Sequence, residues 1–135
     1  MLGDGATAGL PLALLLRALG AASVNLVSHA SIRRMLHGDA ASRERIQGAA
    51  RSAELVFTAV GAPGYLNADF VAPGAVVVDI GIRVDGTCVR GDVHPSLLAP
   101  GSPAGAVSPV PGGVGPLTVA ALVDNVVAAW ERDAR

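Results

Sequence analysis

Pro109-Val110-Pro111-Gly112-Gly113-Val114-Gly115-Pro116-Leu117-Thr118 is the stretch that decides how the rest of the chain is interpreted. Three glycines and three prolines in ten residues exclude an ordinary strand or helix, since proline fixes φ and lacks an N–H while glycine tolerates φ > 0. Pro116 suits the first turn of a helix. Apolar residues then recur at helical spacing: Val119, Leu122, Val123, Val126, Val127 and Trp130. The pattern predicts a rigid glycine loop that opens a helix over 116–132 and offers backbone N–H groups to a ligand.

Pro111 to Thr118 resembles the PGGVGPMT signature near the end of the bifunctional methylenetetrahydrofolate dehydrogenase/cyclohydrolase (FolD-type) family. Leu117 stands where the family usually has methionine. A glycine turn before a helix is the simpler interpretation of two or three glycines. Seven matching residues among eight in register favour the family.

Composition indicates one folded domain, 1–135, rather than a disordered or nucleic-acid-binding chain. The sequence is 51% apolar and 16% charged, with a net charge of −1, which fits neither of those classes. A lone cysteine, Cys88, excludes an internal disulfide framework and fits a reducing cytoplasm. The apolar run over residues 9–16 is too short to cross a membrane and lacks the basic flank of a signal peptide, so we interpret it as a buried helix and expect no membrane partner.

A second glycine loop stands near the start of the chain. Gly3-Asp4-Gly5-Ala6-Thr7-Ala8-Gly9-Leu10-Pro11 is typical of a loop that approaches phosphate and opens a helix. It resembles the family's G-R/A-S-x-x-V-G-x-P segment at Gly3, Gly9 and Pro11. We expect the helix over 9–19 to be apolar nearly all round and covered on several sides.

Apolar runs predict a parallel sheet. We expect strands over 23–28, 54–60, 75–82 and 106–110, with both faces covered and with helices 9–19 and 116–132 packed on the sheet. The fold class is α/β, a Rossmann-like doubly wound and mostly parallel sheet. Its first strand is truncated, because only Met1 and Leu2 precede the first glycine. Backbone groups left without a hydrogen-bond partner in the middle of a sheet cost about 1–3 kcal/mol each when they are buried. We therefore expect a fragment or a misassigned start site rather than a self-sufficient enzyme.

The segments between these strands carry fewer signals. Residues 31–51 contain two short helical pieces separated by Gly38-Asp39, which we interpret mainly as a solvated excursion; alternatively, Arg33 or Arg34 supplies a cation near a ribose. Asp85-Gly86 predicts a tight hairpin turn. His29 is either a packing residue or a cofactor contact.

The family resemblance implies the site. Gly3, Asp4 and Gly5 would line the phosphates of NADP or NAD, Ala30 would lie at the ribose, and Ile82 would touch the nicotinamide. The glycine loop would border both nicotinamide and folate. Its cofactor-binding positions would be Gly113 and Thr118, and its substrate-bordering positions would be Pro111, Gly112, Val114 and Gly115. No metal is implied. In the family an arginine follows the first glycine and a serine follows the strand-end histidine, both near the 2′-phosphate of NADP. Asp4 and Ala30 stand there, so we expect a weakened NADP preference.

The residues that transfer protons in the family have no counterpart in this sequence. Complete members carry an N-terminal folate domain with a Tyr-x-x-x-Lys pair and an aspartate, and the chain has no lysine. We therefore expect no catalytic residue here and folate binding only with a complementary folate domain. The resemblance also implies a homodimer, one-carbon metabolism and purine biosynthesis. Two hypotheses stay open: the NAD(P) half of the enzyme, or a catalytically silent nucleotide-binding or interaction module.

Overall fold

A parallel sheet forms the centre of the protein. The computed structural model describes residues 1–134. Its three-stranded sheet has the order β1-β2-β5, with β1 at Leu55–Thr58, β2 at Val76–Asp79 and β5 at Ala106–Val107. Both neighbouring pairs are parallel. The expected α/β class with a parallel sheet is confirmed, and three of the four predicted strands are present in shortened form.

Residues 1–3 lie between Val27 and β1. Leu2 forms parallel bridges to Val27 on one side and to Thr58 on the other. The Leu2 N–H donates to the carbonyl of Phe57 at 2.8 Å, and the Ala59 N–H donates to the carbonyl of Leu2 at 2.9 Å. This short piece therefore extends the sheet beyond β1.

The expectation of a strand over 23–28 is wrong, because this segment forms no continuous run of β-pairs. Only Val27 takes part in a β-bridge there, and the rest of the segment has no strand conformation. The physical reason is the short neighbour: residues 1–3 supply hydrogen-bond partners for Asn25 and Val27 alone. An apolar sequence forms a strand only where another strand lies alongside it.

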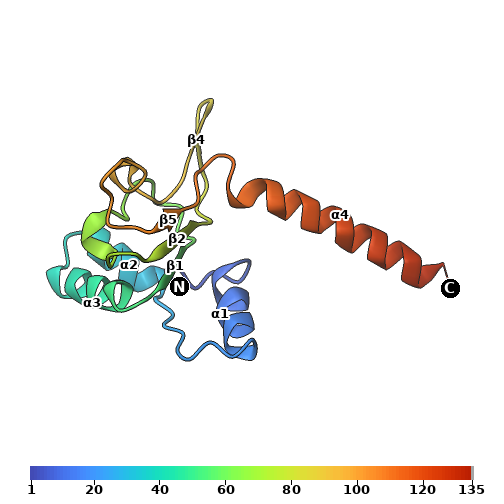
Figure 1. The fold of residues 1–135 in the computed structure, drawn as a ribbon, viewed down its shortest axis with the longest axis horizontal. Helices are drawn as coiled ribbons and strands as arrows, with labels where there is room; N and C mark the ends of the chain where they lie inside the picture. The colour runs from blue at the N-terminus through green and yellow to red at the C-terminus, as the bar shows by residue number, and fades with distance from the viewer. Residues whose placement is uncertain (135) are drawn as a thin grey trace.

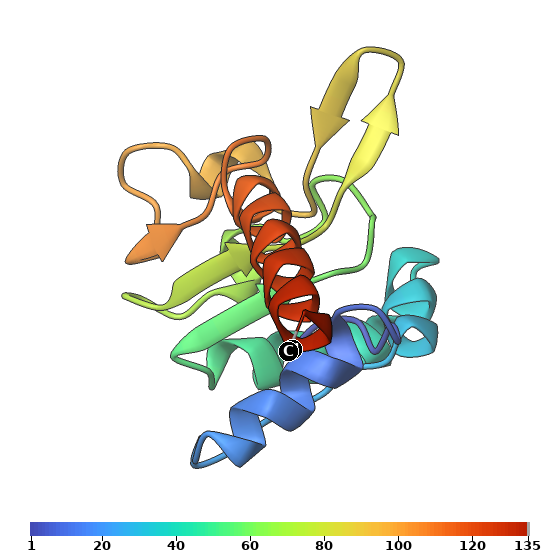
Figure 2. The same cartoon turned by 90° about the vertical axis from the view of Figure 1, so that its right-hand side faces the viewer.

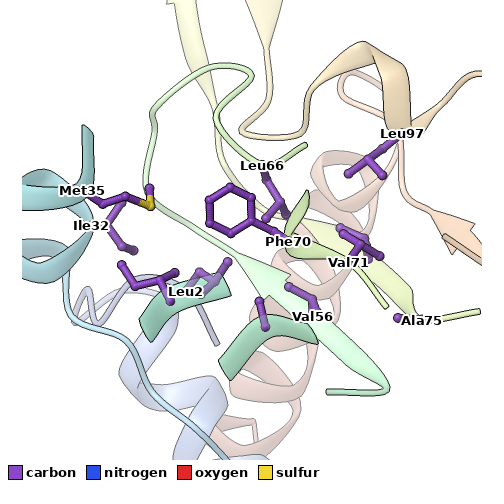
Figure 3. Close-up of a cluster of buried hydrophobic side chains, with 12 residues drawn as sticks. Leu2, Ile32, Met35, Val56, Leu66, Phe70, Val71, Ala75 and Leu97 are labelled. Carbon is purple, nitrogen blue, oxygen red and sulfur yellow. The ribbon is translucent and has the colours of Figure 1, made fainter. Parts of the chain in front are cut away.

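Two helices cover one face of the sheet. They are α2 (His29–Leu36) and α3 (Ala40–Arg51), separated at Gly38, whose φ is +94°, with Asp39 capping α3. The predicted break is confirmed, but the interpretation as a solvated excursion is wrong. Figure 3 shows that these helices contribute to the main hydrophobic cluster. Its members include Leu2, Ile32, Met35, Ile46, Val56, Leu66, Phe70 and Val77.

The other face of the sheet is open, contrary to the expectation that both faces would be covered. Burial alternates along β1 and β2, so that Leu55 is 42% and Val76 is 39% exposed. Helix α1 (Gly9–Ala18) buries only Gly9 and Ala13 and leaves Leu14 exposed, so it is not covered on several sides. The continuous apolar runs predict a sheet with both faces covered, whereas within residues 1–134 one face stays partly exposed.

Helix α4 (Val114–Asp133) extends away from the rest of the molecule (Figure 1). It begins before Pro116 and contains no buried residue, so the expectation that it packs on the sheet is wrong. Figure 2 shows the same helix obliquely, with its C-terminal end toward the viewer. Its length and hydropathy also satisfy the criterion for a membrane-spanning helix, as do core helices of soluble proteins. The absence of a membrane partner therefore stays a prediction.

The remaining elements are short. A hairpin of β3 (Arg83–Asp85) and β4 (Cys88–Arg90) projects from the body (Figure 2), with Gly86 at φ +60° in its turn. The predicted hairpin is confirmed. Two single-turn 3₁₀ helices, η1 (Ala68–Phe70) and η2 (Pro95–Leu97), bury Phe70 and Leu97 against the core.

Candidate functional site

The candidate site lies at the carboxyl edge of the parallel sheet. The chain leaves the first strand at Gly3, β1 at Ala59, β2 at Ile80 and β5 at Ser108. Ligands of open α/β sheets bind at this edge, where loops from neighbouring strands converge. The sequence-predicted cofactor residues lie on these loops or on the helices that follow them.

The first loop is tight enough to require glycine at two positions. Gly3 has φ +102°, and a Cβ there would lie 2.6 Å from the carbonyl oxygen of Ala59. A Cβ on Gly9, the first residue of α1, would overlap the carbonyl of Gly3. The backbone thus passes close to the strand end and then starts a helix. This is the geometry in which backbone N–H groups meet a phosphate, so the loop fits a dinucleotide.

Asp4 and His29 form the polar contact beside this loop. Asp4 Oδ1 accepts a hydrogen bond of 2.8 Å from the backbone N–H of His29, the first residue of α2. His29 Nδ1 lies 2.8 Å from the same oxygen and 3.1 Å from the Asp4 backbone nitrogen. The backbone and side-chain hydrogen bonds from His29 lower the pKa of Asp4. The lowered pKa favours the charged carboxylate. It accepts a hydrogen bond from a backbone N–H at the start of α2 that has no partner within the helix, one residue before Ala30.

A buried carboxylate, Asp92, fixes the loop after β1. Asp92 is 0% exposed, and it accepts hydrogen bonds from the backbone N–H of Val60 and of Ala62, both at 2.7 Å, and from Thr58 Oγ1 at 2.8 Å. Thr58 Oγ1 also lies 2.8 Å from the hydroxyl of Tyr65. Three donors on one carboxylate hold this loop in a single conformation.

Asp79, at the end of β2, holds the segment that carries Asp92. Its carboxylate accepts 2.9 Å hydrogen bonds from the N–H of Gly81 and of Val93, and its own N–H donates to Ser108 Oγ at 2.8 Å. Burial raises the pKa of the Asp79 carboxyl group. The two aspartates thus connect the loops that follow β1, β2 and β5. Sequence reasoning assigned no role to either in cofactor binding, although an aspartate inside an apolar strand was a usable signal.

Burial likewise raises the pKa of Tyr65. The tyrosine packs edge-on against Phe70, with 6.3 Å between ring centroids. It is a partly buried member of the aspartate network, packed against the hydrophobic core.

The glycine loop before α4 follows the end of β5. Gly112 has φ +99° and Gly113 is the N-cap of α4. Val114 and Gly115 form the first turn, with Pro111 just before the loop bend, and Thr118 Oγ1 donates to the Val114 carbonyl at 3.2 Å. Thr118 is exposed, like the rest of α4 from Pro116 onward.

The structure brings together some of the predicted residues and not others. Gly3, Asp4 and Gly5 gather around the His29 ring, whose Cε1 lies 3.5 Å from a Cβ placed on Gly5. Ile82, which is 58% exposed, lies beside the turn at Gly61. No direct contact joins the Gly3 loop to the loop before α4 among the hydrogen bonds of residues 1–134. The cofactor assignments of these residues stay predictions.

Two cavities lie away from this edge. A cavity of about 620 Å³ lies at the amino end of β1, between residues 21–27 and 53–57. A second, of about 350 Å³, lies between α3 and the residues before α2. Nothing in the sequence had pointed to either of them. Within residues 1–134 no group of three or more His, Cys, Asp or Glu side chains is placed to hold a metal ion.

Comparisons with known proteins agree with this geometry. The family model for the tetrahydrofolate dehydrogenase/cyclohydrolase NAD(P)-binding domain matches residues 1–134. The methylenetetrahydrofolate dehydrogenase-cyclohydrolase of Trypanosoma brucei, solved with NADP cofactor and inhibitor, superposes with a TM-score of 0.80 at 32% identity, over 99% of this chain and 43% of that chain. The bifunctional enzyme of Thermoplasma acidophilum is 44% identical, with a TM-score of 0.57, over 64% of this chain and 31% of that chain. The silkworm dehydrogenase is 38% identical, with a TM-score of 0.60 and coverage of 68% and 30%. The chain thus spans less than half of these enzymes.

Proposed function

Because this chain belongs to the tetrahydrofolate dehydrogenase/cyclohydrolase family, as its NAD(P)-binding domain, we propose that it is the nucleotide-binding half of a methylenetetrahydrofolate dehydrogenase/cyclohydrolase. The observation that supports the proposal most is the tight Gly3 loop at the carboxyl edge of the sheet. Neither Gly3 nor Gly9 has room for a side chain there. In the proposed reaction the bound nucleotide accepts a hydride from the methylene carbon of the substrate. Hydrolysis of the methenyl product then gives formyltetrahydrofolate.

The contribution of this chain is binding and orientation. The N–H groups of the Gly3 loop and the start of α1 hold the phosphates, and the helix dipole favours their charge. The Asp92 and Asp79 hydrogen bonds hold the loops after β1 and β2 in place, so that Ile82 packs at the nicotinamide end. The loop over 111–115 separates nucleotide from folate. Fixed positioning of two reactants can lower a barrier by roughly 7–11 kcal/mol.

Turnover in this proposal needs the folate-binding part of the enzyme, because the chain itself has no lysine for the proton steps. Exposure of α4 supports the same view. Leu117 and Trp130 are each 70% exposed. An exposed apolar helix surface of this kind is typical of a site where another domain packs. We further propose a cytoplasmic location, in keeping with the free and exposed Cys88. We also propose that the complete enzyme is a homodimer and that it acts in one-carbon metabolism, in the supply to purine biosynthesis.

The alternative is a catalytically silent module, and the exposed apolar face of α4 also suits capture of another partner. One assay separates the two functions. NAD(P)H formation from methylenetetrahydrofolate is measured with the 135-residue chain alone and with the folate domain of a related enzyme added. We expect no useful turnover by the chain alone and measurable turnover by the mixture. Robust turnover without the added domain would contradict the half-enzyme proposal, and nucleotide binding with no turnover in any mixture would favour the silent module.

A further inference from the structure

The His29 ring lies between the Asp4 carboxylate and the glycine loop at the start of the chain. Its Nδ1 is 2.8 Å from Asp4 Oδ1 and 3.1 Å from the Asp4 backbone nitrogen. Its Cε1 lies 3.2 Å from a Cβ placed on Gly3 and 3.5 Å from one placed on Gly5. The edge of the ring that carries both nitrogens therefore runs along the loop, one residue before Ala30, where the ribose is expected.

The contacts of this ring depend on its protonation state. A neutral imidazole has one N–H donor and the imidazolium has two. When His29 is protonated, Nδ1–H donates to Asp4 Oδ1 at 2.8 Å, and the Nε2–H remains available, because Nε2 has no hydrogen-bond partner within residues 1–134. The two side chains are 39% and 40% exposed, so both are open to solvent. Protonation therefore adds a positive charge and a free donor beside the glycine loop.

Asp4 is the charged group that this proton affects most. Among residues 1–134, only Asp4 lies within ion-pair distance of the His29 ring nitrogens. On α2 itself, Arg33 follows one turn later on the same helical face; it and the positive end of the helix oppose a proton on His29, and Asp4 favours it. Strand β1 and the residue after it are uncharged, and the carboxylates of Asp79 and Asp92 accept hydrogen bonds within their own loops.

From this geometry we propose that His29 is a specificity-determining residue, whose protonation controls how strongly the site discriminates against a 2′-phosphate on the ribose. The assignment rests on the proposed function, because it takes the carboxyl edge as the nucleotide site. With His29 neutral, the charge of Asp4 is uncompensated and repels the phosphate. With His29 protonated, the ion pair offsets this charge and Nε2–H is available to a phosphate oxygen. The preference for NAD over NADP therefore belongs to neutral and alkaline pH and narrows in acid.

Calorimetric titration of NAD and of NADP at about pH 8 and about pH 5.5 tests the assignment, since histidine changes charge between these values. The quantity compared is the ratio of the two dissociation constants, NADP over NAD. His29→Asn cannot gain the proton, with His29→Gln as a second such variant. His37→Asn is the matched control, because His37 lies at the far end of α2. The 2′-phosphate itself takes up a proton at about pH 6, and the variants without the imidazole measure that contribution separately.

On acidification we expect the ratio to fall roughly fivefold further in the unaltered chain and in His37→Asn than in the His29 variants, the size typical of an exposed ion pair. Thermal unfolding at both pH values verifies that each form is folded. An equal fall in all forms, or no fall in the unaltered chain, would overturn the assignment while NAD binding left the proposed function standing. Binding of neither nucleotide to the folded chain would contradict the proposed function and the assignment together.

Discussion

The carboxylate of Asp4 accepts a hydrogen bond from the backbone N–H of His29, twenty-five residues later, at 2.8 Å. This contact places a negative charge at the start of α2, beside Ala30, where a dinucleotide-binding fold reads the adenosine ribose. A phosphate on that ribose would meet Asp4 in place of a donor. The relationship bears directly on which nucleotide the protein prefers.

We expect NAD to bind more tightly than NADP. Each charge-assisted hydrogen bond that is missing at the 2′-phosphate costs roughly 1.5–3 kcal/mol, or about tenfold and more in affinity. Asp4→Asn should narrow the difference, while Asp85→Asn in the hairpin turn should leave it unchanged. Calorimetric titration of both nucleotides measures this. A clear NADP preference that survives Arg33→Ala combined with Arg34→Ala would refute the expectation.

Removing the buried Asp92 carboxylate should destabilise the protein strongly. Asp92→Ala leaves the N–H groups of Val60 and Ala62 without their acceptor, at about 1–3 kcal/mol for each group that stays unpaired, whereas the Thr58 hydroxyl keeps that of Tyr65 as a partner. Asp69→Ala is the matched control, because Asp69 forms an exposed ion pair with Arg43 at 3.2 Å; such pairs contribute at most about 1 kcal/mol. Urea unfolding compares the two, and equal losses would contradict the role given to Asp92.

Stability should depend on the protonation of the Met1 amino group. Burial lowers the pKa of this group below its ordinary value of 8.0. Between the lowered pKa and 8.0 the unfolded chain binds a proton that the folded chain does not, so the free energy of unfolding should rise with pH across this window and level off above it. The acetylated chain should lack this rise. Identical pH profiles for the free and acetylated forms would show that the amine is not buried.

Helix α4 should give a clear signal when a partner covers it. Trp130 is the single tryptophan of the chain and is 70% exposed, so its fluorescence reports on α4 alone. We expect red-shifted emission in dilute protein and a blue shift on self-association or when the folate domain is added, with sedimentation recording the association state. Blue emission from a dilute monomer would mean that α4 folds back onto its own domain.

The glycine positions explain why much of this fold could be predicted from the sequence. Gly3, Gly9 and Gly113 mark loop geometries that other residues resist, and such local requirements can be read directly from the residues. Strands β1 and β2 were predictable for a similar reason, since their β-branched apolar residues favour extended structure.

The predictions that failed concern long-range packing. Residues 23–28 have a strand-like sequence but have a partner only at Asn25 and Val27. Helices α1 and α4 are apolar, yet apolarity does not say which surface covers them or whether it belongs to the same chain. The Asp92 network links residues up to 34 positions apart, and no local pattern encodes such a contact.

The measurement that tests the central claim most directly is calorimetric titration of NAD into the chain and into two glycine-to-alanine variants. A methyl group on Gly9 would overlap the Gly3 carbonyl, whereas one on Gly48, also in a helix, meets no atom within 4 Å. If the carboxyl edge binds the nucleotide, the chain and Gly48→Ala should bind it equally and Gly9→Ala should lose at least tenfold in affinity, with thermal unfolding confirming that all three are folded. Unchanged affinity in a folded Gly9→Ala variant, or no binding by the folded chain, would contradict the account.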